Sequence, residues 1–86
     1  LEETWLTIPG LARRQYELYT DTYAELLEQL RESMGFELSV PVPVLAGYLA
    51  AMTDGLTLNF LALGDEKACA EILDTVTDHV AALVRE

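Results

Sequence analysis

Residues 41–63 are apolar around most of the circumference of the helix that their spacing predicts. At 100° per residue, one strip contains Leu45, Leu49, Met52, Leu56, Phe60 and Leu63. A second strip beside it contains Val44, Tyr48, Ala51, Gly55, Leu58 and Ala62. A helix that is apolar over more than half of its surface must be covered from two sides. Because 86 residues supply little material for both covers, we expect a second copy or another chain to supply one.

Gly55 lies in the middle of this second strip. A glycine inside a helix costs about 0.5–1 kcal/mol relative to alanine, unless the close approach of another helix offsets the loss. The small residues of the strip therefore favour a helix–helix contact between chains. The alternative, that Gly55 marks only a local irregularity, stays open at this point.

Two further helices flank the central one. Residues 11–34 have apolar positions three and four apart, and Gly35 is placed to end that helix. Residues 65–85 form the last helix, and the tight Gly64-Asp65 junction predicts that it runs antiparallel to residues 43–63. Pro9-Gly10 is a turn signal that closes residues 1–8, and no strand is expected. The expected fold is all-α, with three main helices in an antiparallel bundle.

Net charge and composition exclude several partners. Fifteen acidic against five basic residues give a net charge of −10, which repels DNA phosphates and anionic lipid headgroups. The uncharged stretch 38–53 is too short for a membrane span, and we expect no secretory signal. We therefore expect no nucleic-acid binding by this chain, no membrane and a cytoplasmic location. The first residue is not methionine, so we expect residues 1–86 to be a piece of a longer protein.

Candidate catalytic chemistry is sparse. Cys69 is the only cysteine and His79 the only histidine, so the sequence has no disulfide and no metal-ligand pattern. The two lie about three turns apart on one predicted helix, which favours a packed thiol rather than a nucleophile with its base. Asp54-Gly55-Leu56 lacks the serine to which an acyl carrier protein attaches its cofactor. We expect no enzyme activity, no cofactor and no metal.

Aromatic and methionine side chains on the inward strips are the remaining candidates for function. Tyrosine offers an apolar ring with a polar end, and methionine adapts its shape to a ligand. We expect a small apolar or aromatic molecule to bind between residues 11–34 and 43–63. Its predicted contacts are Trp5, at the mouth, and Tyr19, Tyr23, Met52 and Phe60. The alternative is that these side chains are ordinary core.

One stretch of sequence resembles a known family. Gly35-Phe36-Glu37-Leu38 leads through two prolines into Leu45-Ala46-Gly47-Tyr48-Leu49-Ala50-Ala51-Met52-Thr53-Asp54-Gly55-Leu56-Thr57-Leu58. This pattern is similar to the C-terminal domain of TetR-type transcriptional repressors, and Asp-Gly-Leu within a long apolar helix is its best marker. Val42 and Asn59 depart from the residues that are common in that family.

The resemblance implies an effector-binding and homodimerisation domain, whose last two helices pair with those of a second subunit in a four-helix bundle. The expected dimer contacts are Tyr48, Ala51, Gly55, Leu58, Ala62, Ile72, Val76, His79 and Leu83. Operator DNA would be bound by an N-terminal helix-turn-helix that these 86 residues do not include. The alternative function is a helical interaction module without a small-molecule ligand. The sequence names neither the effector nor the operator.

Overall fold

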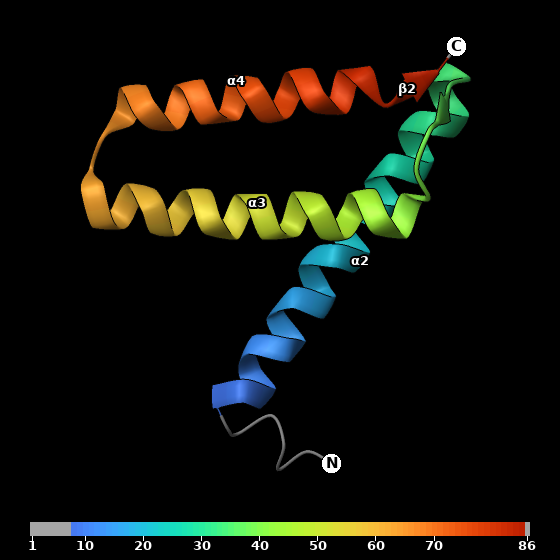
Figure 1. The fold of residues 1–86 in the computed structure, drawn as a ribbon. Helices are drawn as coiled ribbons and strands as arrows, with labels where there is room; N and C mark the ends of the chain where they lie inside the picture. Colours follow the sequence, from blue (N-terminus) through green and yellow to red (C-terminus); the bar gives the residue numbers. More distant parts are fainter. Residues whose placement is uncertain (1–7, 86) are drawn as a thin grey trace.

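The computed structural model describes residues 8–85, and three long helices account for most of them (Figure 1). Helix α2 spans Ile8–Met34, α3 spans Val42–Leu63 and α4 spans Glu66–Ala82. Two short strands, β1 at Glu37–Leu38 and β2 at Val84–Arg85, pair antiparallel. The all-α prediction with three main helices is confirmed. The expectation of no strand is wrong, although each strand has only two residues.

Local turn chemistry sets most helix ends. Gly35 and Gly64 adopt positive φ values of 71° and 64°, which glycine reaches without the steric cost of a side chain. The Asp65 carboxylate accepts a hydrogen bond from the Ala68 N–H and caps α4, as its position predicts. The turn expected at Pro9-Gly10 does not form. Both residues lie in the first turn of α2, where proline is tolerated. Helix α4 ends at Ala82, before the expected boundary, and β2 follows it.

Helices α3 and α4 run side by side in opposite directions, whereas α2 lies obliquely across α3 (Figure 1). At that crossing Ala46 and Ala50 are completely buried, one turn apart on α3. Their small side chains allow the two backbones to approach closely. Leu27 of α2 and Leu45 of α3 complete the set of buried apolar side chains among the described residues. The core is therefore concentrated at one helix crossing.

The connector between α2 and α3 is held against the end of α4. Glu37 is opposite Arg85 and Leu38 is opposite Val84 in the strand pair. The Ser39 N–H and hydroxyl both donate to the Leu83 carbonyl, at 2.8 and 3.0 Å. Ser39 therefore does not cap α3, whose N-cap residue is Pro41.

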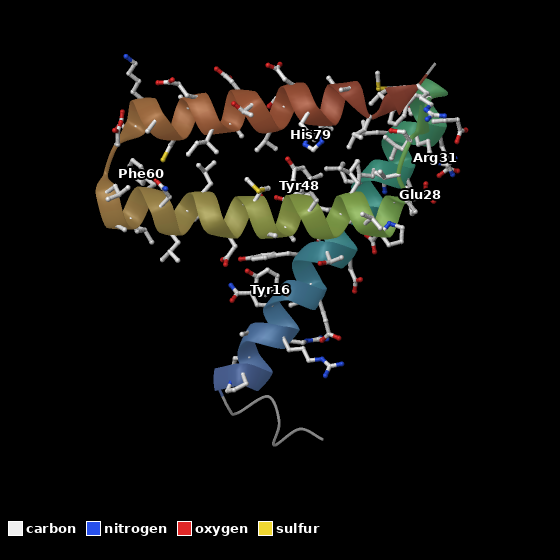
Figure 2. All side chains as sticks on the ribbon, in the orientation of Figure 1. Tyr16, Glu28, Arg31, Tyr48, Phe60 and His79 are labelled. Atoms are coloured by element: carbon white, nitrogen blue, oxygen red, sulfur yellow. The ribbon has the colours of Figure 1, made fainter. Side chains whose placement is uncertain are left out.

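Arg31 ties this connector to α2. Its Nε–H donates to Glu28 at 2.8 Å and its Nη1–H to Glu37 at 3.3 Å, near the C-terminal end of α2, where Figure 2 labels Glu28 and Arg31. The hydrogen bond and charge of Glu28, with the charge of Glu37, raise the pKa of Arg31 above its usual range. The guanidinium therefore stays charged and holds both carboxylates.

Among the described residues, α3 alone is long and apolar enough to cross a bilayer by length and composition. Core helices of water-soluble proteins pass the same test, so no membrane assignment follows. Only 17% of its most apolar window is buried, which leaves much of this helix uncovered.

The crossing predicts a sharp sensitivity to side-chain size. Ala46→Leu should lower the free energy of unfolding by about 1–3 kcal/mol, because added methyl groups at a fully buried site force the helices apart. Urea unfolding followed by circular dichroism would measure it. Ala70→Leu on the exposed side of α4 is the matched control, and equal stabilities for the two variants would contradict the close crossing.

Candidate functional site

A cavity of about 340 Å³ lies between α3 and α4 and is bordered on one side by α2. Its lining consists of Tyr23 from α2, Leu49, Met52, Thr53 and Leu56 from α3, and Ile72, Leu73, Val76, Thr77 and Val80 from α4. None of these side chains carries a formal charge. The volume falls within the range of small-molecule sites, which are lined mostly by apolar groups with a few polar ones.

A pair of hydroxyl groups forms the polar edge of this cavity. The Tyr23 hydroxyl and Thr53 Oγ1 are 2.8 Å apart and share one hydrogen bond. The Thr77 hydroxyl donates to the Leu73 carbonyl of its own helix at 2.9 Å. The Tyr23–Thr53 pair therefore has donor and acceptor capacity left for a polar atom of a bound molecule.

Tyr48 and His79 meet between α3 and α4, where Figure 2 shows their side chains pointing toward each other. The Tyr48 hydroxyl lies 3.1 Å from His79 Nδ1, and the two rings are edge to face with centroids 5.4 Å apart. A second, smaller hollow of about 200 Å³ lies beside this pair. Its lining is Val40, Val44, Leu45, Tyr48, His79 and Leu83.

One side of α3 remains uncovered. Helix α2 contacts α3 on the side of Ala46, Ala50, Thr53 and Asp54, and the second apolar strip lies on the opposite side. We call that strip, together with His79, the association face: Val44, Tyr48, Ala51, Gly55, Leu58, Ala62 and His79. The association face contains no Asp, Glu, Lys or Arg. Val44 and Leu58 are 58% and 66% exposed, and a side-chain carbon added at Gly55 would meet nothing within 4 Å.

Within residues 8–85, no group of three or more His, Cys, Asp or Glu side chains is arranged to hold a metal ion. The Cys69 thiol is half-buried and donates a weak hydrogen bond to Asn59 Oδ1 at 3.8 Å.

A family model described as "BetI-type transcriptional repressor, C-terminal" matches residues 6–85. The chain belongs to this family. The resemblance to the C-terminal domain of TetR-type regulators is thereby confirmed, and the described helices are those of a C-terminal regulatory domain. Comparison with curated proteins and with solved structures gave no match in either case.

In this TetR-type domain, the residues predicted to bind an effector fall in three places. Tyr23 and Met52 line the cavity. Tyr19 and Phe60 are each 41% exposed and lie outside its lining, and Trp5 lies outside the described residues. The cavity lies mainly between α3 and α4 rather than between α2 and α3. Facing apolar stripes on residues 45–56 and 72–80 were the sequence signal for this site.

The residues predicted for the dimer contact of this TetR-type domain fall into two groups, exposed residues and residues that already pack within the chain. Ala51, Gly55, Leu58, Ala62 and His79 are exposed. Tyr48 is half-buried beside His79. Ile72 and Val76 line the cavity, and Leu83 packs against the core cluster of Leu27, Leu45 and Ala46. Ala51, Gly55, Leu58 and Ala62 are thus exposed to another chain, whereas the other five, including His79 through its hydrogen bond with Tyr48, are already in contact within this one.

Tyr16 fastens the N-terminal half of α2 to α3. Its hydroxyl donates to Asp54 Oδ2 at 2.6 Å. This hydrogen bond, with partial burial and the carboxylate charge, raises the pKa of Tyr16 above its ordinary value of 10.0. Asp54, the acidic residue of the Asp-Gly-Leu marker, therefore has a structural role at the helix crossing.

The raised pKa predicts how Tyr16 contributes to stability at high pH. The folded state favours the protonated hydroxyl, so its contribution is complete below pH 10 and is lost as the pH rises through the raised pKa. Tyr16→Phe should therefore be less stable than wild type at neutral pH and should approach it at alkaline pH. Urea unfolding across that range would measure the difference.

Tyr19→Phe is the control, because the Tyr19 hydroxyl accepts a hydrogen bond from the Gln15 amide at 3.1 Å. A stability difference between wild type and Tyr16→Phe that does not change with pH would contradict the role assigned to Asp54.

Proposed function

We propose that this chain is the effector-sensing and homodimerisation domain of a TetR-type transcriptional repressor. Membership of the family supports a regulatory C-terminal domain. The uncovered association face is the observation that carries the dimerisation part. In the family context, operator DNA is bound by a separate N-terminal part, and the location is the cytoplasm.

The shape of the described chain supports the need for a partner. Its radius of gyration is 15.2 Å, whereas about 12 Å is expected for a compact domain of this length. Its smallest extent is 17 Å. Apolar side chains on the association face remain in contact with water, and burial against a second copy gains about 25 cal/mol per Å² of apolar surface.

The cavity between α3 and α4 supports the effector part of the proposal. Its lining has no carboxylate to balance a cation and no Lys or Arg to balance an anion. Burying an unpaired charge there would cost several kcal/mol. The effector class that fits is a neutral, largely apolar molecule with one hydrogen-bonding group for the Tyr23–Thr53 pair.

A plain interaction module is the second candidate function. Its supporting observation is that Tyr19 and Phe60, two of the aromatic residues predicted to bind an effector, lie outside the cavity. In that case the cavity would be covered by other parts of the protein and would bind nothing.

Gly55→Leu tests the dimer. Within one chain a Cβ atom added at Gly55 meets nothing within 4 Å, and leucine is a better helix former than glycine. The variant should therefore keep its helical content. Its dimer dissociation constant should rise about tenfold or more, because the added side chain separates α3 of one copy from the helix of the second copy that packs on it. Sedimentation equilibrium would measure the constant, and wild type should have about twice the 9.5 kDa chain mass.

Ala81→Leu, at an exposed position of α4 outside the association face, is the matched control. A monomeric wild type at micromolar concentration, or tight dimers for Gly55→Leu, would contradict dimerisation through this face.

Matched fluorescent probes test the effector class. Phenylnaphthylamine is neutral, and anilinonaphthalene sulfonate has the same ring system with an added negative charge. The neutral probe should bind at least about tenfold more tightly than the sulfonate, because the lining offers no cation. A naphthyl trimethylammonium salt should be equally disfavoured.

Val76→Trp should fill the cavity and abolish binding of the neutral probe, whereas Leu61→Trp, at a 75% exposed position outside the lining, should not. Equal affinity for the three probes, or binding of the neutral probe that survives Val76→Trp, would contradict the effector site and favour the interaction module.

A further inference from the structure

His79 is the one residue of the association face whose side chain changes its charge near neutral pH. A histidine ring in water is mostly neutral at about pH 8 and mostly protonated at about pH 5.5. The chain contains a single histidine, so no second imidazole titrates in this range. His79 is exposed in the single chain, where water can solvate the protonated ring. A second copy that covers this face has to accommodate that charge or exclude it.

The groups that surround the His79 ring within the chain are uncharged. From α3, the Tyr48 hydroxyl lies 3.1 Å from His79 Nδ1, and Figure 2 shows the two side chains pointing toward each other. The connector contributes Val40 to the hollow beside the ring. Among the described residues, no ion pair involves His79. The helical neighbours of His79 on α4, three and four positions away, are Thr75, Val76, Ala82 and Leu83.

The nearest acidic residues of α4 lie on another side of that helix. Asp78 is next to His79 in the sequence, and successive residues of a helix are about 100° apart. Asp74 is five residues away, which is about 140° around the helix. Both are exposed to water, where salt screens their charges over about 8 Å. Their attraction for a protonated ring is therefore weak.

Protonation also changes the hydrogen bonds that the ring requires. Neutral imidazole has one N–H donor and one acceptor, whereas the protonated ring has two donors. The Tyr48 hydroxyl can partner Nδ1 in both states, because a hydroxyl donates or accepts. The donor at Nε2 then needs water or a further acceptor. A second copy brings the same face, whose side chains are apolar apart from its own Tyr48–His79 pair. A buried charge without a partner costs several kcal/mol.

We propose that two copies pair through the association face only with His79 neutral, so that protonation of His79 in mild acid dissociates the dimer. This inference rests on the proposed dimerisation and adds a pH-dependent control to it. The free chain binds a proton at His79 that the dimer excludes, so association releases protons and is favoured as the pH rises. The dimer is therefore strongest at about pH 8 and weakens as the pH falls to about 5.5.

Charge repulsion between the copies acts in the opposite direction. Each copy has a net charge of −10, and a proton on His79 reduces that repulsion. The carboxylates of α4 lie outside the association face, however, and at about 0.15 M salt interactions beyond about 8 Å are largely screened. The loss of water around the ring occurs at the contact itself, where salt has little effect. Desolvation should therefore determine the sign at this salt concentration.

The dimer dissociation constant at about pH 8 and at about pH 5.5, in about 0.15 M salt, tests this control. For wild type the constant should rise at least about tenfold in acid, because both copies must lose a proton to pair. Sedimentation equilibrium gives the constants, and circular dichroism checks that the chain stays helical at both values.

Two variants are the matched controls. His79→Gln keeps a neutral side chain that can hydrogen-bond to Tyr48, so its constant should change less than about threefold over the same range. The double variant His79→Gln/Ala81→His moves the histidine two residues along α4, to an exposed position outside the association face. It should behave like His79→Gln, because its ring stays in water in the dimer.

Proton NMR of the single histidine measures the same linkage directly. The ring C–H signals of His79 shift on protonation, and no other histidine contributes to them. The midpoint of this titration should be at least about one pH unit lower in the wild-type dimer than in dissociated Gly55→Leu, because one unit corresponds to a tenfold change in affinity for the proton.

The outcomes separate this inference from the proposed function. Weakening in acid that is confined to chains with His79 supports the control. A wild-type dimer whose affinity is constant or increases in acid, or a pH dependence that His79→Gln retains, would overturn it and leave dimerisation standing. A wild type that is monomeric at about pH 8 would contradict the dimer itself.

Discussion

The close crossing of α2 over α3 is the contact on which the rest of the structure depends. It requires small side chains on α3, and Ala46 and Ala50 provide them with complete burial. Because α2 then covers this side of α3, it cannot also cover the side of Gly55 and Leu58. The same contact that forms the core therefore leaves an apolar face exposed. A helix that is apolar nearly all round needs more than one neighbour, and α2 and α4 together do not enclose it.

The two hollows of the molecule lie on different sides of the α3–α4 pair and have different chemistry. The larger is bordered by α2 and carries the Tyr23–Thr53 hydroxyl pair. The smaller lies at the Tyr48–His79 contact, next to the uncovered strip. Thr53 belongs to the first and its neighbour Asp54 anchors Tyr16 of α2. One turn of α3 thus contacts both the cavity and the N-terminal half of α2.

Sequence reasoning predicted what depends on neighbouring residues and missed what depends on distant ones. Gly35, Gly64 and Asp65 end or begin helices through bonds within a few residues, and all three positions were predicted correctly. The strand pair joins Leu38 to Val84, and no local pattern in a two-residue strand reveals that partner. The apolar stripes of α3 were visible in the sequence, but the rotation of each helix depends on packing. The cavity was therefore predicted against α2, although α4 contributes half of its lining residues and α2 only Tyr23.

The β1–β2 pair has a mechanical consequence for the helical hairpin. Helix α4 is joined to α3 at one end by Gly64-Asp65, and at the other end β2 and the Ser39–Leu83 hydrogen bonds hold it to the segment that leads into α3. The hairpin is therefore closed into a ring that is clamped at both ends. Separation of α3 from α4 has to occur by bowing in the middle, at the level of Met52 and Val76, and not by swinging one end open like a hinge.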